Sequence, residues 1–245
     1  AAGASHESLH WGYGQNDGPA QWARLNPKFA LCAEGREQSP IDLSNAKPVD
    51  HARGVLDYRA TSLKIIRQEH AVEVTDNGHT IQINYDEGSV LKLGTKTYAL
   101  KQYHFHAPSE HTVDGQSFPM EMHLVHQSAA GELAVLGVLI KTGAHNPAFA
   151  PVWAHLPRKS GEKVHLEHVR INVDDLLPAR DHGFRYRGSL TTPPCSEGVT
   201  WIVAAQPIEL SAEQIAAFTA IFNGNNRPVQ PLGKRLITID RISEH

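Results

Sequence analysis

The 245-residue sequence has no long apolar run, no excess of basic residues and only two cysteines. Its longest apolar stretch, Leu133–Ile140, is far shorter than the roughly 18–20 residues that a membrane-spanning helix needs. The formal net charge of −3 argues against a nucleic-acid-binding surface. Cys32 and Cys195 are either two buried thiols or one disulfide, and only the disulfide would indicate an oxidising compartment.

The remaining composition is that of an ordinary globular protein, with 40% hydrophobic and 20% charged residues. No internal repeat and no linker-like segment divides the chain, so we expect a single domain over residues 1–245. The first forty residues, about 1–40, are rich in Gly, Pro, Asn and Trp without a sustained period, which predicts an irregular segment packed on that domain. The chain begins with small residues, Ala1–Ala4, as would a mature chain that has lost its leader or one shortened at this end.

Short strands dominate the predicted secondary structure. The expected strands are Ala71–Thr75, Thr80–Tyr85, Ser89–Leu93, Thr97–His106, Glu121–Gln127, Leu133–Ile140 and Val199–Ala204. The turn residues Asp76–Gly78 predict a hairpin between the first two. Helical periodicity is restricted to Ser211–Phe222, with Ser211 as N-cap, and to a short segment near Pro147–Leu156. The fold class is therefore mixed and β-dominated, with a large, mostly antiparallel twisted sheet and a few short peripheral helices.

Histidines on two of these strands form a candidate metal site. Because side chains alternate along a strand, Gln102, His104 and His106 share one face. Glu121 and His123 share one face of the next strand. If the two strands are neighbours, three imidazoles can hold a tetrahedral ion and leave its fourth position to water, which is the pattern of catalytic zinc.

Each of these signals has a structural alternative. A His-x-His pair on a strand is, taken alone, more often two surface or hydrogen-bonded histidines than a pair of ligands. By its phase, His126 faces away from His123 and is expected to be a hydrogen-bonded core residue. A ligating histidine needs its second ring nitrogen held, and Gln102 and Glu121 lie on the correct faces to hold it.

Two further segments supply polar groups that would suit such a site. Glu110 follows the first histidine strand closely, and Thr191 lies in the sequence Thr191–Pro194, which alone would indicate only a turn. A threonine hydroxyl that accepts a hydrogen bond from a zinc-bound hydroxide must donate its own proton elsewhere, and a carboxylate can accept it. Glu110 and Thr191 are therefore a candidate relay.

Taken together, these segments resemble the alpha-class carbonic anhydrases of the bacterial, periplasmic or secreted type. The likeness runs through most of the chain and keeps the order of the family. The segments that carry it are His10–Tyr13, Gln38–Ile41, Asn77–His79, His104–His106, Ser109–Thr112, Glu121–His126, Gly188–Pro194 and Arg227–Leu232.

The resemblance implies an enzyme that hydrates carbon dioxide reversibly to bicarbonate and a proton through a zinc-bound hydroxide, with weak esterase activity as a side reaction. It implies Zn²⁺ as the cofactor, bound by His104, His106 and His123. The resemblance also implies that Gln102, Glu121 and the backbone near Asn225 surround the ligands, that Glu110 and Thr191 form the relay, and that Thr192 lies on the polar side. It implies that the wall of the carbon dioxide site consists of Val125, Val135, Leu190, Val199 and Trp201. Tyr13 and Gln82 would lie along a chain of ordered water, and His111 and Tyr186 would form a buried pair.

The resemblance also implies that His79 shuttles protons, because it follows Asn77-Gly78 as in the family and an imidazole titrates near neutral pH. His70 is a competing candidate, but it lacks the preceding Asn-Gly and lies one strand too early.

Two features of this chain differ from the cytosolic vertebrate members. The segment between His126 and Leu133 is shorter, which predicts a more open pocket rim, and pairing of Cys32 with Cys195 resembles the bacterial and secreted branch. The resemblance therefore implies a periplasmic or secreted protein, sulfonamide and anion inhibitors at the zinc, no nucleic-acid or membrane partner, and, as in many bacterial members, a homodimer.

Two other functions remain open at this point. A catalytically inactive carbonic anhydrase-like binding module would keep the fold and lose a ligand, yet all three histidines are present. An unrelated histidine-rich metalloprotein would explain the histidines but leave the Gly188–Pro194 segment unexplained.

Overall fold

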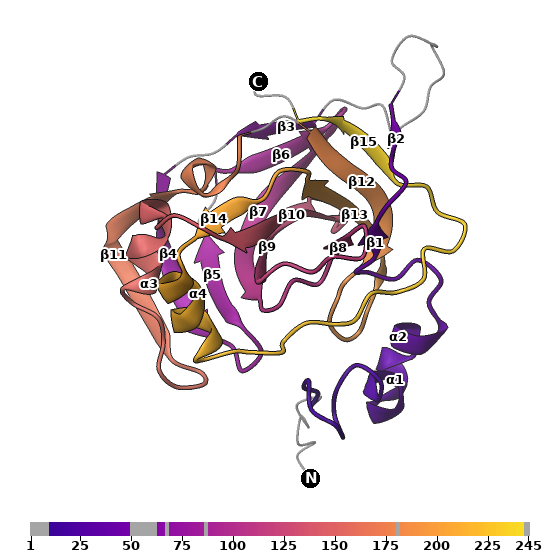
Figure 1. Cartoon of the computed structure of the whole chain (residues 1–245), viewed down its shortest axis with the longest axis horizontal. Coiled ribbons are helices and arrows are strands. Elements are labelled where there is room, and N and C mark those ends of the chain that lie inside the picture. The colour runs from indigo at the N-terminus through magenta and orange to yellow at the C-terminus, as the bar shows by residue number, and fades with distance from the viewer. Residues whose placement is uncertain (1–9, 50–62, 67–68, 86–87, 180–181, 243–245) are drawn as a thin grey trace, which may run out of the picture.

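A computed structural model describes residues 10–49, 63–66, 69–85, 88–179 and 182–242. One large twisted sheet runs through the molecule, and the short helices lie at its periphery (Figure 1). The strand order in the sheet is β11 (Lys163–Asn172), β4 (Glu69–Asp76), β5 (Ile81–Tyr85), β7 (Lys96–His106), β9 (Met120–Ser128), β10 (Leu133–Thr142), β13 (Glu197–Ala204), β12 (His182–Ser189), β15 (Thr238–Arg241) and β2 (Lys47–Pro48).

Three more strands join this sheet beside that path. β14 (Ile208–Leu210) pairs with β10, and β6 (Val90–Leu93) pairs with β7 and with β3 (Leu63–Ile66). β10 runs parallel to β13 and β14, and β15 runs parallel to β2, whereas the other described pairs of the large sheet are antiparallel. β1 (Asp42–Leu43) and β8 (Thr112–Val113) form a separate parallel pair. The predicted fold class is confirmed.

The expected hairpin at Asp76–Gly78 is present as β4 and β5, and Gly78 adopts a φ of 88°, which glycine tolerates best. All seven expected strands occur, with ends that shift by one or two residues. Sequence patterns did not predict β11 and β12. The pairing of β11 with β4 is interrupted between Leu166 and Ile171, and β12 carries two glycines and two arginines instead of an apolar alternation.

The described helices are short. They are α1 (Trp22–Leu25), α2 (Leu31–Glu34), α3 (Ala150–Trp153) and α4 (Ala212–Thr219), with 3₁₀ turns at Pro27–Phe29, Pro147–Phe149 and Val173–Leu176. Ser211 caps α4 in a capping box with Gln214, so that prediction is confirmed, although the helix ends at Thr219. The helix expected near Pro147–Leu156 is also present.

The expectation of a wholly irregular first forty residues is wrong for the described part, because α1 and α2 lie there. Each has four residues, about one turn, which is too short to produce a visible hydrophobic period. Their burial rests on aromatic packing of Trp22 and Phe29 with the cysteines rather than on a helical face. No helix in the described ranges is both long and apolar enough to cross a membrane.

The sheet separates two apolar clusters. One contains Tyr103 and Phe105 of β7 together with the face of α4 that carries Phe218. The other contains Val135 of β10 and Trp201 of β13. Because side chains alternate along β7, its histidines face away from the first cluster. The second face of the sheet is therefore where a polar site can form.

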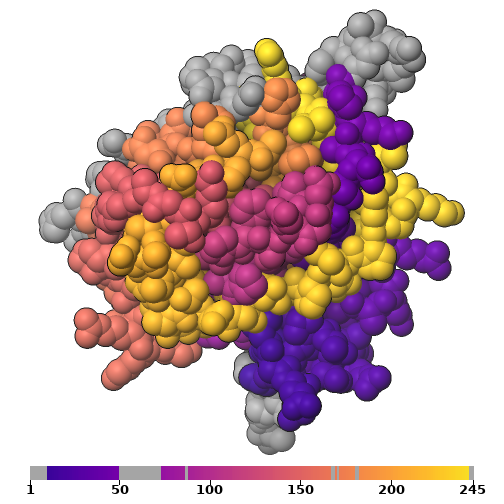
Figure 2. Space-filling model, in the orientation of Figure 1, coloured from indigo at the N-terminus to yellow at the C-terminus, as the bar shows by residue number. Residues whose placement is uncertain are grey.

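The N-terminal segment is tied to this sheet by a disulfide between Cys32 and Cys195, which confirms the predicted pairing. The Arg227 guanidinium donates hydrogen bonds to the carbonyls of Cys32 and Ser39 and to the side chain of Gln38. Figure 2 shows the indigo N-terminal segment lying against the yellow C-terminal segment that carries Arg227. Two segments nearly two hundred residues apart thus support each other.

We predict that the disulfide is fully formed and stabilising. Reduction should lower the free energy of unfolding by about 2–4 kcal/mol, because the unfolded chain gains the freedom that the cross-link of 163 residues removes. Mass spectrometry under non-reducing conditions should detect no free thiol, and urea unfolding with and without reductant should show the loss. Two freely alkylated cysteines in the native protein would refute the prediction.

Candidate metal centre and active site

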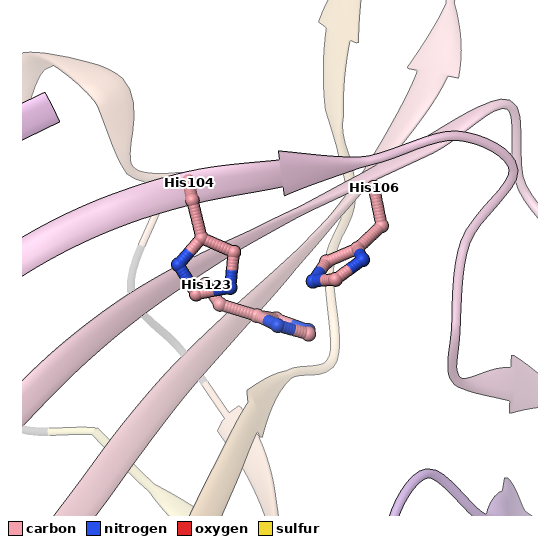
Figure 3. A group of neighbouring side chains, drawn as sticks. All are labelled: His104, His106 and His123. Carbon is pink, nitrogen blue, oxygen red and sulfur yellow. The ribbon is translucent and has the colours of Figure 1, made fainter. Parts of the chain in front are cut away.

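The register between β7 and β9 brings the three predicted histidines together. His104 lies directly opposite His123, and His106 lies opposite Glu121. The ring centroids are 5.1 Å apart for His104 and His106, 5.3 Å for His104 and His123, and 4.7 Å for His106 and His123. One nitrogen of each ring lies within 4.8 Å of the others, and Figure 3 shows the rings converging from the two strands.

The opposite nitrogen of each ring is held by a neighbour. The Oε1 atom of Gln102 accepts from His104 Nδ1 at 2.7 Å, the backbone carbonyl of Asn225 accepts from His106 Nδ1 at 2.6 Å, and the Glu121 carboxylate accepts from His123 Nε2. The nitrogens left to face one another are therefore Nε2 of His104, Nε2 of His106 and Nδ1 of His123. His106 Nε2 is buried and has no hydrogen-bond partner in the described part of the chain.

Glu121 is the most heavily bonded carboxylate of the site. It is fully buried and accepts hydrogen bonds from the backbone N–H groups of Glu110 and His111, at 3.1 and 2.8 Å. It also accepts from the imidazoles of His111 and His123. Burial alone would raise the pKa of Glu121. Its electrostatic attraction to His111 and His123, and the hydrogen bonds from both rings, instead hold that pKa well below the ordinary value.

The same environment sets the protonation of the histidines. Burial, reinforced by the neighbouring imidazoles, lowers the pKa of His104 well below 6.5, and burial also lowers the pKa of His106 against the opposing effect of Glu110. For His123, burial is outweighed by Glu121, so its pKa rises. At neutral pH, His104 and His106 therefore present free lone pairs, as metal ligation requires.

This donor set fits a zinc ion. Three imidazole nitrogens, each oriented by a second hydrogen bond, are the ligand type and number of catalytic zinc sites, and the partnerless His106 Nε2 is an atom that such an ion would satisfy. A second possible group, His111, Glu121 and His123, fits less well. The atoms that would bind there are already hydrogen-bonded to one another.

Glu110 lies at the inner edge of the histidine group. Its Oε2 accepts from the backbone N–H of Arg227 at 2.7 Å. Its Oε1 is buried without a hydrogen-bond partner among the described residues, 3.3 Å from His106 Nε2 and 3.8 Å from His123 Nδ1. Thr191 is buried, and its pairing with Glu110 stays a prediction. The Thr192 carbonyl accepts from the Cys195 N–H at 2.9 Å, which closes the turn directly after Thr191, and the disulfide joins this turn to Cys32.

Apolar side chains from several segments pack on one side of His123. Val125 and Val135 face each other across β9 and β10, and Val135 lies opposite Trp201 of β13. The Trp201 ring centroid is 4.8 Å from that of His123. The members of this cluster that the sequence singled out are Val125, Val135, Leu190, Val199 and Trp201. The structure therefore brings all five predicted wall residues together.

The predicted shuttle residue lies at the turn before β5. The His79 ring stacks on Trp11, with centroids 3.6 Å apart and planes 7° from parallel, and it is half-buried. Burial lowers the pKa of His79, and electrostatic repulsion from His10 lowers it further, although the negative charges of Asp17 and Asp76 oppose the shift.

Tyr13 and Gln82, predicted along a water chain, have separate surroundings. Tyr13 packs edge-on against two tryptophan rings, and burial raises its pKa well above 10. Gln82 lies opposite His104 in the sheet and accepts a hydrogen bond from Asn77.

Three other histidines were given roles or considered in the sequence analysis, and the structure describes each to a different extent. His126 is fully buried and its Nδ1 lies 3.3 Å from the Ala134 carbonyl, as expected for a core residue. The backbone of His70 pairs with Ile171, while its side chain lies outside the described residues. His111 Nε2 lies 2.5 Å from the Tyr186 hydroxyl, as predicted for this buried pair.

Sequence reasoning missed the outer part of this network. The Tyr186 hydroxyl donates to Ser39 Oγ, which also accepts from the Ser189 N–H. The Trp201 indole donates to the Ser189 carbonyl. A buried series of hydrogen bonds thus leads from His123 through Glu121, His111 and Tyr186 to the segment that precedes Thr191. A serine carries no local signal for such a role, because its partners come from distant segments.

A substitution at Gly188 would test this network. A Cβ atom there would overlap Ser39 Oγ and lie 2.8 Å from the Trp201 ring, so Gly188→Ala must displace Ser39. We expect a loss of about 1–3 kcal/mol in the free energy of unfolding, measured by urea titration. Wild-type stability in the variant would contradict the packing described for Ser39.

Comparisons with known proteins agree with this geometry. Residues 17–241 match the model of the eukaryotic-type carbonic anhydrase family. A carbonic anhydrase of Nostoc sp. is 45% identical over 234 residues, covering 96% of this chain and 87% of the relative. One from Pectobacterium carotovorum is 42% identical, covering 94% and 91%.

A solved structure of the alpha-carbonic anhydrase of Thermovibrio ammonificans with the inhibitor sulfanilamide superposes with a TM-score of 0.86 at 42% identity, covering 94% of this chain and 99% of that one. With a family match over nearly the whole chain and relatives above 40% identity, this chain belongs to the eukaryotic-type carbonic anhydrase family.

Proposed function

We propose that this protein catalyses the reversible hydration of carbon dioxide to bicarbonate and a proton, with Zn²⁺ held by His104, His106 and His123. The observation that carries the proposal is the set of three converging nitrogens whose opposite ring atoms are all fixed by hydrogen bonds. When bound, zinc lowers the pKa of a water toward neutrality and so supplies a nucleophile, an effect for which carbonic anhydrase is itself the standard example.

The protein's part begins with the ligands. Three neutral imidazoles leave the full charge of a bound ion uncompensated, unlike thiolate or carboxylate ligands. Gln102, Glu121 and the Asn225 carbonyl orient the rings. Glu121 in turn is fixed by two backbone N–H groups, so the rings are preorganised before any substrate enters.

Glu110 and Thr191 would orient the nucleophile. Glu110 Oε2 already accepts from the Arg227 N–H, and its buried, partnerless Oε1 would accept a hydrogen bond from the Thr191 hydroxyl. A threonine oxygen that donates to Glu110 can use its lone pairs as an acceptor toward the reacting oxygen. Thr192 would line the same polar side.

The apolar wall would hold the substrate. Carbon dioxide is uncharged and offers weak hydrogen-bond acceptors, so Val125, Val135, Leu190, Val199 and Trp201 suit it better than they suit bicarbonate. Placing this wall against His123 puts the substrate beside the metal centre and favours release of the charged product.

His79 would carry the released proton to solvent, since an imidazole titrates near neutral pH, and burial, which lowers the pKa of His79, favours the neutral ring that can accept a proton. Tyr13 and Gln82 would order water between His79 and the site. The competing reading, an inactive binding module, is not favoured because all three histidines, Glu110 and Thr191 are in place.

Other features of the protein are proposed on the same basis. The disulfide supports a periplasmic or secreted location. The sulfanilamide complex of the Thermovibrio relative supports inhibition of this enzyme by sulfonamides at zinc. The continuous sheet supports one catalytic domain over residues 1–245, and a homodimer remains a proposal from the family alone.

The ligand assignment predicts the effect of His123→Ala. Removing one of three protein ligands should lower zinc content after dialysis and reduce hydration activity to near background. His126→Gln, on the other face of the same strand, is the matched control and should retain zinc. A His123→Ala protein with full zinc and normal activity would exclude the assignment.

The relay predicts a different pattern for Thr191→Ala. Zinc should stay bound because no ligand is lost, while kcat/KM for hydration should fall about 10²-fold, since one positioned hydrogen bond is missing in the transition state. Zinc analysis and stopped-flow hydration measure the two effects. Unchanged activity would place the relay elsewhere.

The shuttle predicts that His79→Ala lowers kcat in dilute buffer, on the order of 10–10²-fold, and leaves kcat/KM nearly intact. Proton export limits turnover, whereas attack on carbon dioxide does not need the imidazole. Added imidazole buffer should restore much of the rate. Equal kcat for wild type and variant, without imidazole rescue, would decide against the shuttle.

A further inference from the structure

A groove of about 1300 Å³ lies apart from the three histidines. Its walls come from the segment after α2, the start of β7, strands β12 and β13, and the C-terminal segment before β15. Arg185 and Arg187 flank Tyr186 on β12; the Tyr186 hydroxyl contacts His111, and its ring lies under Arg235. Arg185, Tyr186 and Arg187 all line the groove, whereas none of the three histidines does.

The lining is basic in a chain that is acidic as a whole. It includes two acidic residues, Glu37 and Glu132, against six basic residues, which are Arg36, Lys96, Arg185, Arg187, Lys234 and Arg235. The whole chain has a formal net charge of −3. A concave surface of one predominant sign concentrates ions of the opposite sign, so this groove attracts anions.

Part of this charge is already compensated at the rim. Lys96 contacts Glu132 at 2.8 Å, and Arg187 lies 3.8 Å from Glu37, but both basic side chains remain more than half exposed. Arg235 is bound to backbone carbonyls and lies over the Tyr186 ring. The rim pairs are solvent-exposed and weak, so an incoming anion can replace them at little cost.

The floor of the groove carries polar groups that are unusual for a sheet interior. Arg185 is only 7% exposed, and its Nη2 lies 3.8 Å from an Asp240 carboxylate oxygen. Directly opposite Arg185 in the sheet, Thr238 has a buried hydroxyl without a hydrogen-bond partner among the described residues. Buried hydroxyl groups are normally satisfied, so a ligand oxygen at this end of the groove would supply a missing interaction.

We propose that this groove binds a small molecule with two or more phosphate or carboxylate groups. Guanidinium groups match both kinds of anion with paired hydrogen bonds, and the basic residues stand on separate walls, which favours a ligand with several charges. The volume exceeds what one inorganic anion fills and is in the range of small-molecule sites or somewhat above it. None of the three histidines lines the groove.

The test is calorimetric titration of the purified full chain with inorganic tripolyphosphate, and separately with citrate, at low ionic strength. The charge-reversal pair Lys96→Glu with Arg187→Glu should raise the Kd at least 10-fold. A matched control, Lys141→Glu with Arg158→Glu, changes the net charge equally at exposed positions outside the groove and should shift the Kd less than 2-fold. Comparing the two titrants shows whether phosphate or carboxylate is preferred.

Two outcomes overturn the proposal. One is the absence of measurable binding of either anion by the wild-type protein. The other is equal weakening in the groove pair and the control pair, which would mean that only overall charge attracts the anion. Hydration of carbon dioxide should be unchanged in the Lys96→Glu, Arg187→Glu variant. A failure of the anion-binding inference would therefore leave the proposed function standing, and a failure of the proposed function would leave the anion-binding inference standing.

Discussion

The antiparallel register of β7 and β9 is the constraint on which the site depends. Pairing His104 with His123 and His106 with Glu121 places three imidazoles, and the carboxylate that orients one of them, on one face. If the pairing slipped by one residue, the polar side chains of one of the two strands would move to the apolar face that Tyr103 and Phe105 occupy. The apolar side chains on the other face therefore fix the register, and the register fixes the histidines.

Glu121 links this register to the rest of the molecule. A carboxylate buried without partners would be strongly unfavourable, but this one accepts bonds from two imidazoles and two backbone N–H groups. From His111 the chain continues through Tyr186 to Ser39 and Ser189. Such a network is stable only when every member is satisfied, so the segment before Thr191 and the histidine group form one unit.

A second anchor acts from the opposite end of the chain. Arg227 uses its backbone N–H to hold Glu110 and its guanidinium to hold the segment around Cys32, while the disulfide ties Cys32 to the turn after Thr191. Glu110 and Thr191, which the proposed relay needs together, are thus positioned by groups that come from near both ends of the chain.

How much of this the sequence could predict depends on the range of each interaction. Alternation along a strand is local, so His104, His106 and His123 were found from their spacing, and the apolar period with Ser211 found α4. The disulfide, the Asn225 carbonyl and the wall of five apolar residues came from resemblance to a family, because they join distant segments.

The roles of Ser39, Ser189 and Arg227 had no local signal, since each acts through a backbone or hydroxyl contact that only the folded chain creates. The short helices α1 and α2 and the interrupted strand β11 were missed for a related reason. A period cannot be read from four residues or across a shift in register.

The most direct test of the central claim is X-ray absorption spectroscopy of the zinc-loaded protein. The account predicts one zinc per chain with three imidazole nitrogens at about 2.0–2.1 Å and a single further light-atom ligand. The observation that would contradict it is a first coordination shell with fewer than three imidazoles, or one completed by a protein carboxylate such as Glu110.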